Sequence, residues 1–124
     1  MPSTSKGVIL VVDDDKDIRE AVVDSLADEG YAAVALADAP SALTYLRQEP
    51  LPLLVLLDWN MTPMNAPQFM AEVAKEPAWS AIPVVLLTAD ARAEDKAKQA
   101  AFVGYLKKPV RLRDLVRFTQ IYCQ

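Results

Sequence analysis

The sequence predicts an α/β protein in which helices cover both faces of a parallel sheet. Two continuous apolar runs, Val8–Val12 and Leu53–Leu57, are rich in branched residues, which is typical of parallel strands buried on both faces. Segments with apolar residues three and four positions apart lie between such runs, as expected for helices that pack on a sheet. The two patterns alternate from end to end, so we expect five strands and five helices.

Local signals place the elements of the first half of the chain. After the first apolar run, residues 17–28 carry one apolar helical stripe, and Gly30 suits the C-terminal cap of that helix. Residues 31–36 are expected to form a short second strand. Asp38 suits the N-cap of the next helix and Pro40 suits its first turn. Two further prolines then break the chain before the third strand.

The second half continues the alternation. Pro67 opens a third helix and Pro77 closes it. Residues 82–87 are expected to form the fourth strand, residues 91–101 an alanine-rich helix, and residues 103–106 a short fifth strand. A final helix follows, and its expected apolar stripe consists of Leu112, Leu115, Val116 and Thr119.

Composition limits the classes of function. The 124 residues suit one domain with a single core, and a net charge of −4 argues against non-specific nucleic-acid binding. No apolar run approaches the ~20 residues that cross a bilayer. Residues 1–6, which we expect to be disordered, lack the apolar core of a signal peptide. We therefore expect a cytoplasmic protein that does not bind membranes. Histidine is absent, which excludes histidine-based catalysis, and the single Cys123 is expected on a mobile tail.

Three carboxylates follow the two apolar runs. Asp13 and Asp14 come directly after the first run, and Asp58 comes directly after the second. Ligands of open parallel sheets bind just outside the carboxyl ends of the strands, so these side chains are expected to converge. Two like charges about 4 Å apart repel by roughly 4 kcal/mol at an effective dielectric near 20. A hard cation such as Mg²⁺, which prefers oxygen ligands, would relieve that repulsion. Asp15 is instead expected to be exposed at the start of the following helix.

Four short motifs occur in order, each at the end of an expected strand. The chain thereby resembles the response-regulator receiver domains, the CheY-like phosphoacceptor modules of two-component signalling. This resemblance implies a single receiver domain over residues 1–124 and a flavodoxin-like, doubly wound sheet of order 2-1-3-4-5. The motifs are Val11-Val12-Asp13-Asp14, Leu57-Asp58-Trp59-Asn60-Met61, Leu87-Thr88-Ala89 and Lys107-Lys108-Pro109.

The resemblance also implies a role for each residue of the acidic cluster. Asp58 would be the phosphoacceptor, taking a phosphoryl group from a histidine kinase or a histidine phosphotransfer protein. Asp14, Asp58 and the main-chain carbonyl of Asn60 would ligate Mg²⁺, for which Mn²⁺ can substitute, and Asp13 would hold the ion through water. Lys108 would neutralise the phosphoryl oxygens. Such a domain is not a turnover enzyme, although it catalyses its own phosphorylation and dephosphorylation.

By the same resemblance, further residues correspond to those that change conformation on phosphorylation and to those that set the lifetime of the phosphoryl group. Thr88 and Tyr105 resemble the switch pair, in which the hydroxyl moves toward the phosphoryl group and the aromatic ring turns inward. Asn60 and Asp90 occupy the positions that tune hydrolysis. An unknown output protein would bind the region Ala91–Arg117, with no direct contact to nucleic acid.

The chain departs from the family at two places. Ala66 replaces a glycine that commonly eases the loop after the phosphoacceptor, and a positive φ there would cost roughly 1–2 kcal/mol. The span between Thr88 and Tyr105 is shorter than typical, so the fourth helix is expected to be shortened or shifted. In one respect no departure is expected: the resemblance implies that the Lys108–Pro109 peptide bond is cis, as in the family.

Other interpretations remain open from sequence alone. The chain could be a phosphorylation-independent pseudo-receiver scaffold, or a receiver module excised from a hybrid kinase or a larger regulator. A phosphohydrolase that forms an aspartyl phosphate is disfavoured because Asn60 stands where its second aspartate would be. A flavodoxin is disfavoured because Asp13, Asp14 and Asp15 would repel the flavin phosphate.

Basic residues gather near the C-terminal end of an otherwise acidic chain. They predict contact with an acidic partner, although charges on a final helix are also typical of a merely solvated face. Asp114 is the acidic residue among them. The basic residues are Lys107, Arg111, Arg113 and Arg117.

Overall fold

The computed structural model describes residues 7–123, so the expected disorder of residues 1–6 lies outside the described residues. Five parallel strands form one sheet in the order β2-β1-β3-β4-β5, which confirms the flavodoxin-like topology. The strands are β1 (Ile9–Val12), β2 (Ala33–Leu36), β3 (Leu54–Asp58), β4 (Val84–Thr88) and β5 (Gly104–Lys107). The helices are α1 (Lys16–Asp28), α2 (Ala39–Gln48), α3 (Ala66–Ala74), α4 (Ala93–Lys98) and α5 (Leu112–Tyr122), with a 3-10 turn η2 (Pro77–Trp79).

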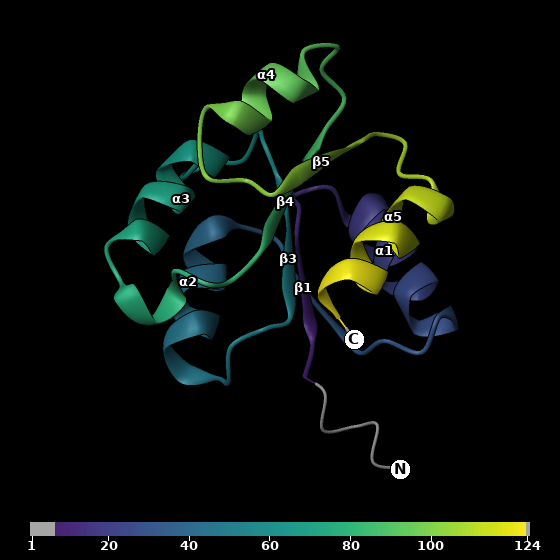
Figure 1. Cartoon of the computed structure of the whole chain (residues 1–124), viewed down its shortest axis with the longest axis horizontal. Coiled ribbons are helices and arrows are strands. Elements are labelled where there is room, and N and C mark those ends of the chain that lie inside the picture. The colour runs from purple at the N-terminus through teal and green to yellow at the C-terminus, as the bar shows by residue number, and fades with distance from the viewer. Residues whose placement is uncertain (1–6, 124) are drawn as a thin grey trace.

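The helices cover the sheet in two layers (Figure 1). With the sheet seen edge-on, α2 and α3 lie on one side, and α1 and α5 lie on the other. Successive strand residues point to opposite faces, so Leu10 and Val12 pack toward α2 and α3 while Ile9 and Val11 pack toward α1 and α5. Burying one such side chain contributes roughly 1.5–3 kcal/mol. The continuous apolar runs thus supply the core on both faces of the sheet.

Side-chain and backbone caps fix the ends of α1 as the sequence predicts. Asp15 is exposed and is the N-cap, because its carboxylate accepts the backbone N–H groups of Asp17 at 2.9 Å and Ile18 at 3.2 Å. Gly30 has a φ of 88°, which glycine adopts without steric cost. The N–H of Gly30 donates to the Ala27 carbonyl, and the N–H of Tyr31 donates to the Leu26 carbonyl. These two hydrogen bonds satisfy carbonyl groups in the last turn of the helix.

The fourth helix is shortened within the range 91–101, as expected from the short span between Thr88 and Tyr105. It spans only the six residues Ala93–Lys98. Residues 91 and 92 form a turn before the helix. The carboxylate of Asp90 accepts the N–H of Arg92 at 2.7 Å, which holds the chain in a turn until Ala93. A helix of this length has little stability of its own and depends on tertiary contacts.

The loop after β3 avoids the strain considered for Ala66. Among the described residues no side-chain-bearing residue has a positive φ. Asn65 instead caps α3 through a reciprocal pair of hydrogen bonds with Gln68, each 2.9 Å long, and Ala66 begins the helix with its side chain buried. The loop therefore enters α3 through a capping box rather than through a glycine turn.

Two expectations for the C-terminal segment are wrong. Leu112 is 47% exposed rather than part of the buried stripe, because it begins α5 beyond the edge of the core. Cys123 is only 2% exposed, and burial raises the pKa of its thiol to about 11. The reason is that α5 extends to Tyr122, and its last turn carries the cysteine onto the α1–α5 side of the sheet. Within residues 7–123, no helix is long and apolar enough to cross a membrane.

Candidate functional site

The three predicted carboxylates converge at the carboxyl edge of the sheet. Val12 of β1 is paired in register with Leu57 of β3, so the residues that follow them are neighbours. Asp13, Asp14 and Asp58 each place a carboxylate oxygen within 4.8 Å of the others. Asp13 is fully buried, Asp58 is 5% exposed, and Asp14 is open to solvent. The cluster therefore has a buried base and one side that solutes can reach.

Lys108 completes the cluster from the segment after β5. Its ammonium donates a 3.0 Å hydrogen bond to Oδ1 of Asp58 and lies 2.9 Å from Oδ2 of Asp13. The backbone N–H of Lys108 donates to the carbonyl of Thr88 at 2.9 Å, which anchors the segment to the end of β4. The following peptide bond, Lys108–Pro109, is cis as expected. The lysine predicted from sequence is thus in direct contact with the predicted phosphoacceptor.

The cluster contains more negative than positive charge. Burial raises the pKa of Asp58 to about 6; the hydrogen bond from Lys108 opposes this shift, and the charges of Asp13 and Asp14 reinforce it. Burial alone would lower the pKa of Lys108, but its ion pairs with Asp13 and Asp58 outweigh burial and raise it. Three carboxylates and one ammonium carry a formal charge of −2.

The donor set fits a hard divalent cation. Oδ1 of Asp13 accepts the N–H of Asp15 at 2.9 Å. Oδ2 of Asp13 is buried, and the cation beside it is the Lys108 ammonium at 2.9 Å, which Asp58 shares. One shared ammonium does not balance the charges of buried carboxylates held close together. A cation beside Asp13, Asp14 and Asp58 would use that oxygen, directly or through water, and cancel the excess charge.

The predicted switch residues lie on neighbouring strands. Leu86 of β4 is in register with Tyr105 of β5, and Thr88 lies two residues further along β4, so Thr88 and Tyr105 point to the same face. Thr88 is buried at the strand end, where its Oγ1 accepts the N–H of Asp90 at 3.1 Å. Tyr105 is half-buried against the core on the α2–α3 side. Their placement is compatible with a coupled movement.

The two residues predicted to tune hydrolysis differ in their surroundings. Asn60 is exposed in the bend after β3. Asp90 is half-buried, and its carboxylate is directed toward α4, with Oδ2 3.6 Å from Nζ of Lys96. Lys96 in turn lies 4.3 Å from the ring centroid of Trp59. Sequence reasoning missed Lys96 because one lysine in an alanine-rich helix carries no signal of such a contact.

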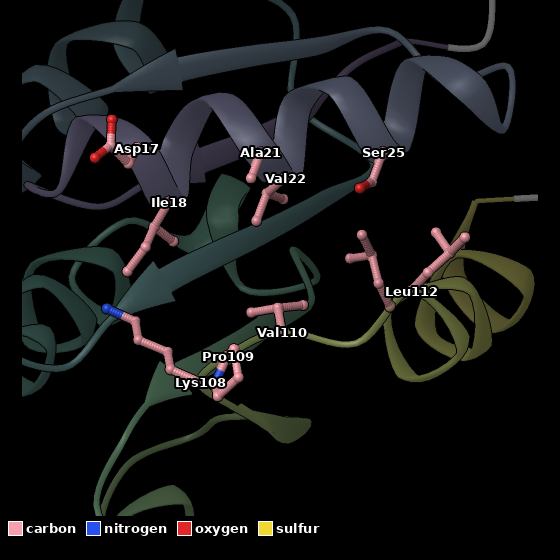
Figure 2. A pocket seen from close by; sticks show the side chains of 10 residues that line it. Asp17, Ile18, Ala21, Val22, Ser25, Lys108, Pro109, Val110 and Leu112 are labelled. Atoms are coloured by element: carbon pink, nitrogen blue, oxygen red, sulfur yellow. The ribbon is translucent and has the colours of Figure 1, made fainter.

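A second unpredicted feature is an apolar groove on the α1–α5 side (Figure 2). Ile18 and Val22 of α1 face Val110 and Leu112 across it, and Lys108 extends from its rim toward the end of a strand. Its cavity volume is about 230 Å³. Leu112, which was expected in the core, instead lines this groove beside the acidic cluster.

Comparisons with known proteins agree with the geometry. A family model described as the response regulator receiver domain matches residues 9–120. An uncharacterized 14.6 kDa protein of Leptolyngbya boryana is 39% identical over 117 residues, which cover 93% of this chain and 88% of that protein. The phosphate regulon transcriptional regulatory protein PhoB of Escherichia coli is 37% identical over 110 residues. That match covers 87% of this chain and 48% of PhoB, so the chain spans about half the length of that relative.

A solved structure gives the same result for the fold. The chemotaxis response regulator CheY4 of Vibrio cholerae has a TM-score of 0.84 and 28% identity to this chain, and the match covers 94% of this chain and 98% of that one.

Proposed function

This chain belongs to the response regulator receiver domains of two-component signalling, and on that premise we propose that Asp58 accepts a phosphoryl group from a histidine kinase or a histidine phosphotransfer protein. The observation that carries the proposal is the direct contact of Lys108 with Asp58, 3.0 Å long, inside a cluster of three converging carboxylates. A scaffold without this chemistry would gain nothing from burying the charges together.

Mg²⁺ bound at this cluster would supply positive charge for the transfer, because the Asp58 carboxylate would otherwise attack a polyanion unaided. Asp14, Asp58 and the main-chain carbonyl of Asn60 would hold the ion, with Asp13 acting through water. A carboxylate oxygen of Asp58 forms a bond to phosphorus while the phosphorus–nitrogen bond to the donor breaks, and the donor imidazole leaves with that electron pair. Lys108, already beside Asp58, is placed to neutralise the transferred oxygens.

Phosphorylation would then reach the partner surface through Thr88 and Tyr105. The Thr88 hydroxyl accepts a hydrogen bond from Asp90 in the present structure, so turning it toward a phosphoryl group releases that loop. Tyr105 shares the face of the sheet on which Thr88 lies, and an inward turn of its ring would alter the region Ala91–Arg117. We propose that this region binds the output protein, in the cytoplasm, and that the domain is a self-modifying phosphoacceptor rather than a turnover enzyme.

The test is phosphorylation by a small donor. Incubation with acetyl phosphate and Mg²⁺ should add one phosphoryl group, read by intact mass spectrometry. The addition should be lost in Asp58→Asn and with a chelator, and kept in Asp24→Asn, which removes an exposed carboxylate from α1. A wild-type protein that stays unmodified by small donors and by histidine kinases would instead favour the pseudo-receiver scaffold.

A further inference from the structure

Lys96 of the short helix α4 contacts two residues that lie near the candidate site, Trp59 after β3 and Asp90 after β4. Its Nζ atom lies 4.3 Å from the ring centroid of Trp59, the residue that follows Asp58. The same atom lies 3.6 Å from Oδ2 of Asp90, in the loop after β4. A cation over an indole face is attracted by the ring electrons. The Lys96 side chain is only 16% exposed, so its ammonium is held between these two groups rather than free in solvent.

The Asp90 carboxylate is engaged by its own loop and by α4. Oδ1 accepts the N–H of Arg92 at 2.7 Å, and Oδ2 faces Lys96. The backbone N–H of Arg92, together with the charges of Lys96 and Arg92, holds the pKa of Asp90 below its ordinary value. The N–H of Asp90 donates to Oγ1 of Thr88 at 3.1 Å. Asp90 therefore lies next to the site through its backbone, while its carboxylate is paired with Lys96 of α4.

We propose that Lys96 is a positioning residue: by holding the Asp90 carboxylate against α4, it keeps that carboxylate from assisting hydrolysis and so lengthens the life of the phosphoryl group on Asp58. The inference rests on the proposed phosphorylation of Asp58. In hydrolysis a water oxygen forms a bond to phosphorus, the bond from phosphorus to the Asp58 oxygen breaks, and the water gives up a proton. A free carboxylate at Asp90 can orient that water and accept its proton.

Lys98 provides a matched control on the same helix. It carries the same charge, but it is solvent-exposed and its ammonium pairs with Glu94 at 3.5 Å. Replacing either lysine with methionine removes one positive charge from α4 while keeping a long side chain. An effect of Lys96 that comes only from the net charge of α4 would therefore appear in both variants, whereas an effect on Asp90 would appear only in Lys96→Met.

The experiment follows the decay of the phosphoprotein. Wild type and variants are phosphorylated with acetyl phosphate and Mg²⁺, desalted, and sampled over time by intact mass spectrometry. Lys96→Met should lose the phosphoryl group roughly threefold to tenfold faster than wild type, which is less than the 10²–10⁴-fold that a fully engaged general base supplies. Lys98→Met should decay at the wild-type rate. Lys96→Arg, which can still stack on Trp59 and pair with Asp90, should restore the slow decay.

A double variant separates positioning from a general structural effect. In the Asp90→Ala background, adding Lys96→Met should change the decay rate no further, because the carboxylate that Lys96 holds is gone. Equal decay of Lys96→Met and Lys98→Met, or acceleration that persists without Asp90, would overturn the inference while leaving Asp58 as phosphoacceptor. A wild-type protein that takes up no phosphoryl group would overturn the proposed function, and this inference with it.

Discussion

Asp58 stands at the end of a strand whose five residues are all buried, whereas Asp90 and Lys96 lie on a segment where only Ala93 and Ala97 of the six helical residues are buried. The first region is positioned by strand register and by close packing on two faces of the sheet. The second is positioned by ion pairs and by one cation–π contact near the surface. Even the more buried of these contacts, the pair of Lys96 with Asp90, joins two single side chains, whereas each strand residue is fixed by packing on every side.

The difference separates two tasks in one small domain. The proposed phosphoryl transfer would need fixed distances between nucleophile, cation and lysine, which a packed sheet can supply. The lifetime of the signal and the choice of partner need adjustment from one protein to another. A segment held by a few weak contacts can be changed by single substitutions without unfolding the sheet. We therefore expect mutations in the two regions to act on different observables.

The largest effect on stability should come from truncating a core side chain next to Asp58. Leu57 is fully buried next to Asp58, and Leu57→Ala should lower the free energy of unfolding by roughly 2–5 kcal/mol because it leaves a cavity. Lys98→Ala, on the exposed side of α4, should stay within about 0.5 kcal/mol of wild type. Urea unfolding followed by circular dichroism measures both. A Leu57→Ala variant as stable as wild type would show that the strand carrying Asp58 is not firmly packed, and would break the comparison.

Metal binding should stabilise the first region by a somewhat smaller amount. A ligand at a hundred times its dissociation constant stabilises the native state by about 2.7 kcal/mol, so saturating Mg²⁺ should raise the Tm by on the order of 10 °C. Asp14→Ala should melt higher than wild type without metal, since one repelling charge is gone, and should lose most of the response to Mg²⁺. Thermal scans with and without a chelator provide the measurement. A full metal response in Asp14→Ala would place the cation elsewhere.

The sequence predicted the first region better than the second for a physical reason. Buried parallel strands can be recognised in a sequence as continuous apolar runs. Because the carboxyl ends of such strands lie at the same edge of the sheet, the convergence of the carboxylates around Asp58 could be predicted from local patterns. The pairing of Lys96 with Trp59 depends on how a shortened helix packs, and no local pattern encodes it. The burial of Cys123 was missed for the same reason, because it depends on the length and docking of α5.

The smallest expected effect concerns the basic residues beside the last strand, and it is kinetic. Lys107, Arg111 and Arg117 line a groove between β5 and α5 together with Asp114, and Arg113 is exposed on the same helix. Reversing Arg113 and Arg117 to Glu should slow association with an acidic output partner, since complementary charge mainly sets the association rate. The variant should stay within about 0.5 kcal/mol of wild type in stability, because exposed charges of this kind rarely contribute more.

The control for this charge reversal is phosphorylation by acetyl phosphate, which should be unchanged because the small donor needs only the acidic cluster and Lys108. A kinase is unsuitable as the donor in this control, since its docking surface can overlap the groove. Stopped-flow association at low and high salt then separates the two interpretations of the basic cluster. A docking surface gives a rate that falls in the variant and depends less on salt than in wild type. Wild-type association at low salt would mean that these charges only solvate α5 and do not form the docking surface.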